Sequence, residues 1–411
     1  MGLVEIGLLL AGLVLGPFLN FGIYSFAYFP RPISVWQLRP SEIEARHWRT
    51  HVPIFGWLFR QNEGNHFGRL FWFRPLLIEL LTPVALILLY RFCMEGAFAP
   101  EGLVRVGAST LLHQFIAFAL LIVLMAIATF IDFDERTIPD MITIPGTLLG
   151  MLGAVVIPDW RLHELAAPVL PALVGVPIPV QANSPEVWNP VWNSSTGLAL
   201  GLSFWTLWCV GMADRRWITR RGLIKAIVYF FEVLKRSPST KTLIGMWLVG
   251  LVCLSIAYGV IGTTRWEALL SSLFGMGLGG TLVWGFRIVA HWAMGQEALG
   301  FGDVTLMAMI GSFFGWQIVC LAFFLAPFFS MIFVVIVWIF TRDSSLPFGP
   351  YLCAATLYCM LDWVRVWGWF SNLFLPPGIS FLIFVFMLLA LGAMLWMIQK
   401  VKRSAGAAMT R

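Results

Sequence analysis

The sequence predicts an all-α polytopic membrane protein, and its composition gives two reasons. Of the 411 residues, 59% are hydrophobic and only 12% are charged, with a mean hydropathy of +0.84. Soluble domains carry about 25% charged residues. The apolar residues also gather in runs close to the roughly 20 residues that span a bilayer. The net charge of +6 therefore does not indicate nucleic-acid binding, because Lys and Arg in a membrane protein mostly set its orientation in the bilayer.

About eleven apolar runs are candidate spans, so we expect roughly 9–11 transmembrane helices. Two runs are weak, because residues 303–317 are few and residues 266–290 contain the glycine-rich "GMGLGG". The runs cover residues 3–28, 75–92, 109–131, 141–158, 195–212, 242–262, 266–290, 303–317, 319–340, 347–364 and 379–399.

Basic residues are concentrated in alternate connections between these runs. Segments 29–74 and 213–241 and the tail after residue 399 are rich in Lys and Arg, whereas 93–108 and 159–194 are poor in them. The positive-inside rule places the basic segments in the cytoplasm and the N-terminus outside. Counting spans then brings the two connections that hold the acids described next to the same cytoplasmic side.

One of these acids, Asp303, lies in the apolar segment "LGFGDVTLMAMIGSFFGW" (299–316), where an ionised carboxylate costs several kcal/mol without compensation. Gly300 and Gly302 precede it and permit a close approach of a substrate strand. The other acid, Asp132, follows "MAIATFI", where a helix should end. Two carboxylates that meet share a proton and titrate as a unit, which is the chemistry of aspartic proteases. The local motif alone allows a plainer role for Asp303, as a helix cap.

In these segments the sequence resembles the type IV prepilin peptidase family, membrane aspartic proteases that share a Gly-x-Gly-Asp motif. The resemblance covers most of the chain outside roughly residues 155–290. The matching segments are "GFGDVTLMAMIGSFFGW", "IDFDERTIPDMITIP" (131–145), "LPFGPYLCAA" (346–355), "LGPFLNFGIY" (15–24), "HVPIFGWLFR" (51–60) and "FRPLLIELLT" (73–82).

The resemblance implies the GxGD aspartic protease architecture and an endopeptidase of the bacterial inner membrane whose active site faces the cytoplasm. It would remove the basic leader of type IV prepilins or type II secretion pseudopilins, so its partners would be these precursors and membrane lipid, with no nucleic acid. The motifs assign catalysis to Asp132 and Asp303, supported by Gly300, Gly302 and Pro139. Cleavage would need no cofactor, and S-adenosylmethionine would be used only if the N-methylation known in the family is retained.

Several neighbouring residues have alternative roles. Asp134 is the less favoured choice for the first catalytic acid. Asp140 belongs to the same motif, and we interpret it as the cap of the helix that begins at residue 141. Glu79 matches a family glutamate, for which an ion pair with Arg74 is favoured over binding of a substrate amine.

The sequence departs from the family pattern in three ways. Residues 29–74 contain no Cys, so the tetrathiolate zinc site of many members is not expected, and the six cysteines are interpreted as small core residues. Thr305 stands where the family usually has Lys. Asp132 and Asp303 are 171 residues apart (303 − 132), farther than usual, and four predicted spans between them keep both on one side.

These observations divide the chain into six predicted parts. They are an N-terminal transmembrane helix (1–28), a cytoplasmic domain without the Cys motif (29–74), a transmembrane region with the first catalytic Asp (75–158), an insertion with an outside loop, extra transmembrane helices and a basic cytoplasmic loop (159–290), the GxGD transmembrane region (291–400) and a cytoplasmic tail (401–411).

Two other classes of function compete with proteolysis. An ion-coupled transporter also carries intramembrane acids and glycine-broken helices. A transporter, however, would be expected to have inverted repeats and acids near the midplane of the membrane, whereas this sequence has no visible internal repeat and both acids fall at the edges of loops. A catalytically inactive scaffold of a pilus or secretion assembly is the other alternative. Within the insertion, the basic run 215–236 is predicted to be an interfacial amphipathic helix.

Overall fold

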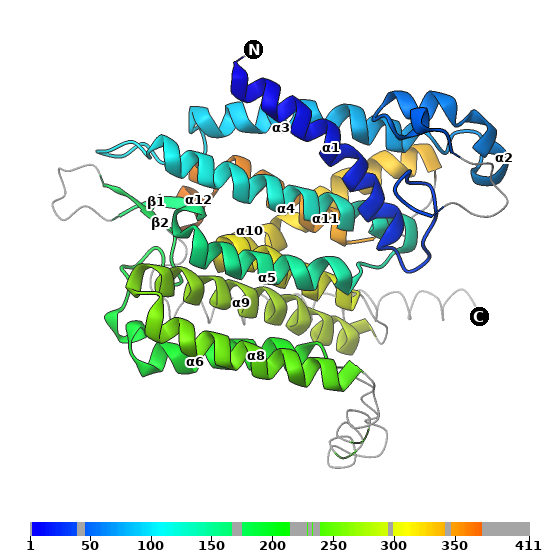
Figure 1. Cartoon of the computed structure of the whole chain (residues 1–411). Helices are drawn as coiled ribbons and strands as arrows, with labels where there is room; N and C mark the ends of the chain where they lie inside the picture. Colours follow the sequence, from blue (N-terminus) through cyan, green and yellow to red (C-terminus); the bar gives the residue numbers. More distant parts are fainter. Residues whose placement is uncertain are drawn as a thin grey trace, which may run out of the picture.

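A computed structural model describes residues 2–38, 46–166, 175–213, 228, 232, 239–294, 299–341 and 347–371. Figure 1 shows a bundle of roughly aligned helices. In the described part, six helices are long and apolar enough to cross a membrane, and three shorter apolar helices accompany them. The predicted all-α membrane architecture is confirmed. The expected amphipathic helix at 215–236, the run 379–399 and the tail 401–411 lie wholly or almost wholly outside the described residues.

Helices α1 (Leu3–Ser25) and α3 (Phe73–Glu95) form one edge of the bundle. They pack closely because α1 presents glycines to α3. A Cβ atom on Gly16 would lie only 2.8 Å from the Cα of Glu79, and Gly12 lies similarly against Pro83. These glycines therefore set the separation of the two helices.

The centre of the bundle is built around α10 (Phe301–Thr341). It packs against α9 (Thr263–Met294), α5 (Asp140–Val156) and α11 (Gly349–Leu361). Helix α10 is kinked at Gly315, whose φ of 83° is left-handed. The kink falls where the predicted runs 303–317 and 319–340 meet.

Two further helices complete this core. Helix α4 (Ala108–Glu135) packs against α3 and α11. Helix α12 (Trp363–Ser371) follows α11, and its buried Trp363 stacks on Trp367 with ring centroids 5.2 Å apart.

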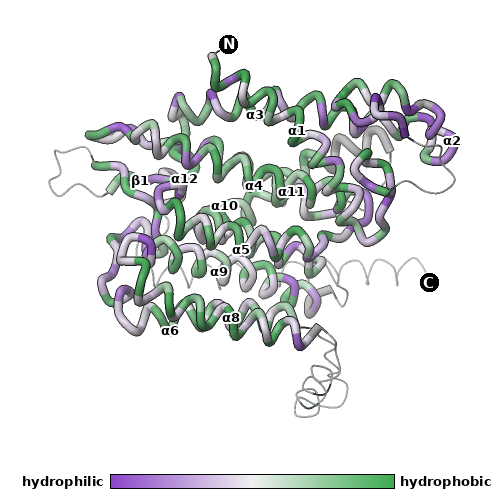
Figure 2. Tube along the Cα trace, in the orientation of Figure 1, coloured by the Kyte–Doolittle hydropathy of each residue, from purple (hydrophilic) through white to green (hydrophobic). Residues whose placement is uncertain are grey.

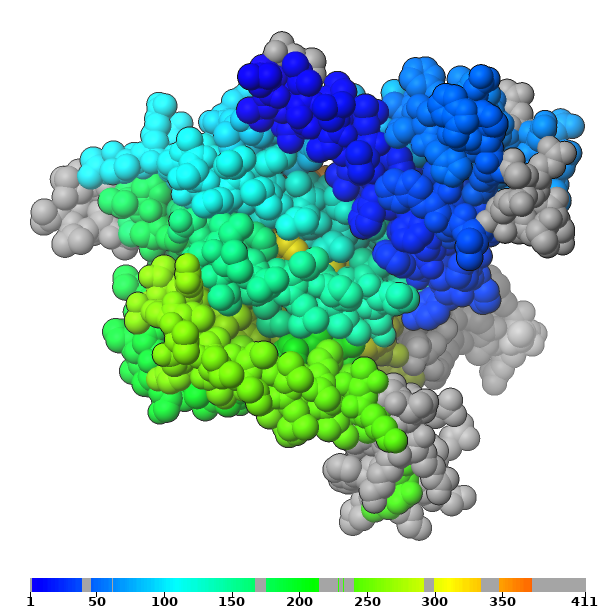
Figure 3. Space-filling view, viewed as in Figure 1, coloured from blue at the N-terminus to red at the C-terminus, as the bar shows by residue number. Residues whose placement is uncertain are grey.

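Helices α6 (Ser195–Gly211) and α8 (Ser239–Val260) pair at the opposite edge and cover α9 from outside. The indole of Trp205 donates a hydrogen bond to the Trp247 carbonyl at 3.0 Å and lies against Gly250. Helix α8 has few buried residues and forms much of the visible surface at this edge (Figure 3). Because the pair adds two crossings, it leaves the segments before and after it at the same end of the bundle.

The connections fall at two ends, and hydrophilic residues concentrate there (Figure 2). One end holds the 3-10 helices η1 (Trp48–His51), η2 (Phe55–Phe59) and η3 (Gln61–Glu63) and helix α2 (Gly64–Phe67). The turn between α4 and α5 and the start of α10 lie at this end as well.

The other end holds the 3-10 helices η4 (Pro158–Trp160) and η5 (Pro190–Asn193). Between them lies a small antiparallel sheet of β1 (His163–Leu165) and β2 (Pro177–Pro179), with His163 opposite Pro179.

A buried ionic cluster stabilises the small domain at the first end. Glu63 accepts hydrogen bonds from Arg60 at 2.6 and 2.9 Å and from Arg46 at 3.0 and 3.1 Å. The Arg60 guanidinium also lies over the ring of Trp57, 4.5 Å from its centroid. Burial raises the pKa of Glu63, but the hydrogen bonds from the two arginines outweigh it and hold that pKa below its ordinary value. The carboxylate is therefore charged at neutral pH.

Glu79 joins this domain to the membrane helices. Its carboxylate accepts hydrogen bonds from the backbone N–H of Ile54 at 2.7 Å and from the side-chain amide of Asn20 at 3.0 Å. The expected ion pair between Glu79 and Arg74 is wrong, because Arg74 pairs with Asp134 at 2.7 Å. The core interpretation of the cysteines holds for five of them, whereas Cys253 is exposed on α8.

Candidate active site

Asp132 occupies the last turn of α4 and is only 4% exposed. Arg136 caps the end of the helix, with a left-handed φ of 57° and an N–H that donates to the Asp132 carbonyl at 2.9 Å. The side-chain oxygen Oδ2 of Asp132 is buried and makes no hydrogen bond to the described residues. A Cβ atom on Gly349, the first residue of α11, would lie 2.5 Å from that oxygen. Gly349 thus lets the α11 backbone approach the carboxylate.

Asp303 occupies the first turn of α10 and is 7% exposed. Its Oδ2 accepts a hydrogen bond from the Gly300 backbone N–H at 3.1 Å. A Cβ atom on Gly302 would lie 2.8 Å from Cβ of Ile138 and 3.0 Å from its N and O atoms, whereas a Cβ on Gly300 would meet nothing closer than 3.7 Å. Gly302 therefore permits close packing between the start of α10 and the turn after α4, and Gly300 supplies a hydrogen bond.

Asp132 and Asp303 line one cavity of about 610 Å³. Its wall comes from the end of α4, the turn leading into α5, the segment 299–303 and residues 347–348 before α11. The volume lies within the range of small-molecule sites and accommodates several residues of a peptide. Asp132 and Asp303, predicted to lie at the same end of the bundle, thus line the same cavity.

The supporting residues of the first motif have different positions. Pro139 is buried and is itself the N-cap of α5. Asp140 is the first residue of that helix and lines the cavity, and its side chain makes no capping hydrogen bond to the residues that the structure describes. The expectation that Asp140 caps the helix is therefore wrong. Thr305, at the position of the family Lys, donates to the Gly302 carbonyl at 3.1 Å and does not line the cavity.

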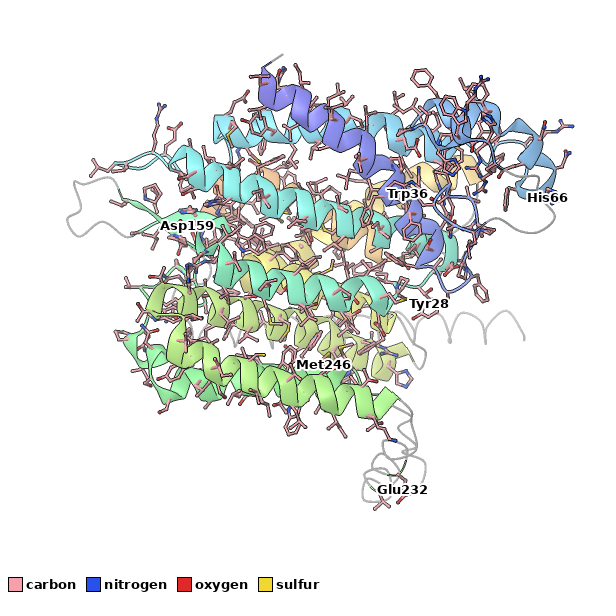
Figure 4. The ribbon with its side chains drawn as sticks, viewed as in Figure 1. Tyr28, Trp36, His66, Asp159, Glu232 and Met246 are labelled. Atoms are coloured by element: carbon pink, nitrogen blue, oxygen red, sulfur yellow. The ribbon has the colours of Figure 1, made fainter. Side chains whose placement is uncertain are left out.

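The structure adds Tyr28, which the sequence did not single out, to the cavity wall. Figure 4 places it beside the N-terminal end of α5. Glu135 fixes this segment by accepting the backbone N–H of Tyr28 at 2.8 Å and of Phe29 at 3.0 Å. Glu135, three residues after Asp132, was the available signal, but its partners Tyr28 and Phe29 lie 107 and 106 residues away.

The carboxylate of Asp134 forms ion pairs with two arginines. It pairs with Arg74 and with Arg31, and it does not line the cavity. This arrangement supports Asp132 as the partner of Asp303. In the part of the chain that the structure describes, no group of three or more His, Cys, Asp or Glu side chains is arranged to hold a metal ion.

Fold and site together define a membrane protein with a paired-aspartate centre at one end of its helices. Residues 238–335, which run from α8 through most of α10, match the model of the type IV leader peptidase family. The resemblance to the type IV prepilin peptidases is therefore confirmed for this part of the chain.

Several curated proteins with similar sequences are also named leader peptidases. The leader peptidase HopD of Escherichia coli is 36% identical over 93 residues, covering 22% of this chain and 57% of the relative. Prepilin leader peptidase/N-methyltransferases of Pseudomonas putida and Pseudomonas aeruginosa are 30% identical over 135 residues and 34% over 105. These matches cover 32% and 25% of this chain and 42% and 33% of the relatives.

The chain thus spans little more than half the length of the first of these relatives, and less of the other two. No solved structure matches it.

Proposed function

We propose that this protein is an intramembrane aspartic endopeptidase that removes the leader of type IV prepilins or type II secretion pseudopilins. The observation that carries the proposal is the shared cavity of Asp132 and Asp303. The names of the relatives supply the substrate class.

The chemistry follows from the pair acting as one unit. The ionised carboxylate takes a proton from a water molecule, which attacks the scissile carbonyl. The protonated carboxyl donates a hydrogen bond to the carbonyl oxygen and then protonates the leaving amine. The N–H of Gly300 holds the Asp303 side chain in place.

The position of the cavity suits a substrate whose apolar helix stays in the bilayer while its leader lies in water. We place the cavity end in the cytoplasm of a bacterial inner membrane, because the basic segment 29–74 emerges there and the positive-inside rule applies. Leu70 at this end is 72% exposed and Val187 at the other is 78% exposed. In a background without native cysteines, a cysteine at position 187 should react with an impermeant thiol reagent outside, and one at position 70 only from inside.

The domain division is retained with one refinement. The family match begins at residue 238, inside the predicted insertion 159–290. Helices α6 and α8 lie outside α9, whereas α9 packs directly on α10. We therefore confine the added segment to about residues 159–237, with α8 and α9 assigned to the part that matches the family.

Methylation is a separate question. Relatives are named N-methyltransferases, and transfer of a methyl group from S-adenosylmethionine to the new N-terminus depends mainly on positioning. We propose that the cleavage step does not depend on zinc, because the Glu63 cluster stabilises the small domain in place of the thiolate-bound zinc of many family members. We also propose that methylation is weak or absent. Mass spectrometry that finds one added methyl group on every processed pilin would refute the proposal on methylation. Loss of cleavage on treatment with a zinc chelator would refute the proposal that cleavage does not depend on zinc.

Two alternatives are less well supported. A transporter would place its acids near the midplane, whereas both acids here lie at helix ends. An inactive scaffold would not need both carboxylates in one cavity. Co-expression with candidate prepilins from the same genome decides between these functions: leader removal, seen as a mass loss, should occur with the native protein and not with Asp303→Asn. No cleavage of any candidate by the native protein would contradict the proposal.

A further inference from the structure

A second cavity, of about 120 Å³, lies beside the proposed active site. It is partly open and is lined by the C-terminal end of α6 (207–212), the C-terminal half of α9 (276–284) and the first turns of α10 (301–308). One of its walls therefore belongs to the added helix α6. The proposed function as described so far gives that helix no role.

The two cavities share one lining residue. Phe301, between the two motif glycines, lines both of them. Val304, Thr305 and Ala308 line the second cavity with it, and this spacing is one face of a helix. Asp303 lies on a different face and lines the first cavity. A group in the second cavity thus contacts a side chain that also lines the cavity of the two aspartates.

The wall of this second cavity is apolar even where hydroxyl groups contribute. Thr281 donates its hydroxyl hydrogen bond to the Gly277 carbonyl at 2.8 Å, and Thr305 donates to the Gly302 carbonyl at 3.1 Å. Neither hydroxyl needs a partner inside the cavity. A charged or strongly polar occupant would lose its hydration without compensation.

We propose that this cavity is a subsite for one apolar side chain of the substrate, within the first turn after the cleaved bond. The inference rests on the proposed function, in which the product begins with the apolar helix that was held at the dyad. The size agrees, because an engineered cavity of roughly 150 Å³ binds benzene. Continuity through Phe301 identifies the substrate, rather than an unrelated partner, as the occupant.

Gly280 offers a way to fill the cavity without disturbing its wall. A Cβ atom there would lie 3.8 Å from Cβ of Ala308 and 4.0 Å from Val304, which is ordinary contact. Gly280→Leu therefore places a side chain in this space without a backbone clash at its first atom. Leu207→Trp narrows the cavity from the α6 side, and Leu248→Trp on the exposed face of α8 is its control, because both leucines are partly exposed.

The experiment measures kcat/KM for a prepilin whose apolar residues in the first turn after the cleaved bond are replaced singly by Ala. With the native protein and with Leu248→Trp, one replacement should lower kcat/KM by roughly tenfold. With Gly280→Leu and with Leu207→Trp, the ratio of kcat/KM between the unaltered and the Ala-substituted prepilin should shrink to about twofold or less. The apolar side chain of the substrate then no longer has a cavity to enter.

An unchanged ratio in both filled variants, or no position that matters in the native protein, would overturn the subsite while leaving cleavage itself established. Failure of the native protein to cleave the unaltered prepilin would count against the proposed function instead. The readout is a ratio between substrates, so a loss of activity that affects all substrates equally does not change it. If one filled variant is too inactive to measure, the other filled variant still gives the ratio.

Discussion

Replacing Gly302 by Ala should cost far more activity than replacing Gly300 by Ala, although both belong to one motif. A Cβ atom on Gly302 would lie 2.8 Å from Cβ of Ile138, about 0.6 Å inside the shortest ordinary contact of 3.4 Å. The neighbours of that Cβ include backbone atoms of Ile138 at 3.0 Å, which cannot rotate away. The start of α10 must therefore move from the turn after α4, and Asp303 moves with it.

The expected size of the effect follows from that displacement. A misplacement of about 1 Å in a catalytic group costs on the order of 100-fold in rate, so a shift of roughly half to one ångström should lower kcat by about 10- to 100-fold. Gly300→Ala meets nothing closer than 3.7 Å and keeps the N–H that bonds Asp303, so it should stay within about threefold of the native rate.

The assay is leader removal from a fixed prepilin by membranes with matched amounts of each variant, followed by mass spectrometry. Similar losses in the two variants would refute the packing argument. So would a Gly302→Ala protein that keeps the native rate.

Three further predictions follow from the geometry around the site. Gly349→Ala should lower the cleavage rate by at least about tenfold, because its Cβ would reach Asp132 Oδ2 at 2.5 Å, and a native rate would refute the contact. Glu135→Gln weakens the hold on Tyr28 and should raise KM more than it lowers kcat, an effect that an unchanged KM would contradict. Glu63→Gln leaves two buried arginines without their carboxylate, which costs about 3–5 kcal/mol, so residues 46–72 should lose protease resistance at neutral pH. Since the pKa of Glu63 is depressed on folding, the native domain should lose the same resistance only as pH falls below the ordinary glutamate value of 4.5, and equal resistance of both proteins at pH 7 would contradict the cluster's role.

The central features of the site could be predicted because each leaves a local signal. The glycines before Asp303, the apolar run ending at Asp132 and the alternation of basic connections are all visible in the sequence. Together they predict two carboxylates at one end of a helix bundle. The kink at Gly315 also coincides with the predicted boundary between two runs.

The errors concern partners chosen by tertiary packing. Glu79 could have paired with Arg74 five residues earlier, but it binds Asn20 and Ile54, 59 and 25 residues distant. Arg74 instead lies beside Asp134, 60 residues away. Such choices depend on which helix faces meet, and sequence spacing within one helix does not determine that.

The closeness of Gly349 to Asp132 was missed for the same reason. The sequence marks the "PFGP" segment as a family signature, but it does not say which carboxylate that segment approaches. The cavity wall formed by Tyr28 likewise depends on hydrogen bonds to Glu135 across 106 and 107 residues.

The central claim is that Asp132 and Asp303 act as one catalytic unit, and a comparison of single and double substitutions tests it most directly. Leader removal would be measured for Asp132→Asn, for Asp303→Asn and for the protein with both changes, with Asp134→Asn as the control because its carboxylate is held by arginines outside the cavity. Residues that act together are non-additive, so all three catalytic variants should fall to the same background, whereas the control keeps substantial activity. Cleavage that persists in either single variant, or a double variant whose loss multiplies the two single losses, would contradict the account.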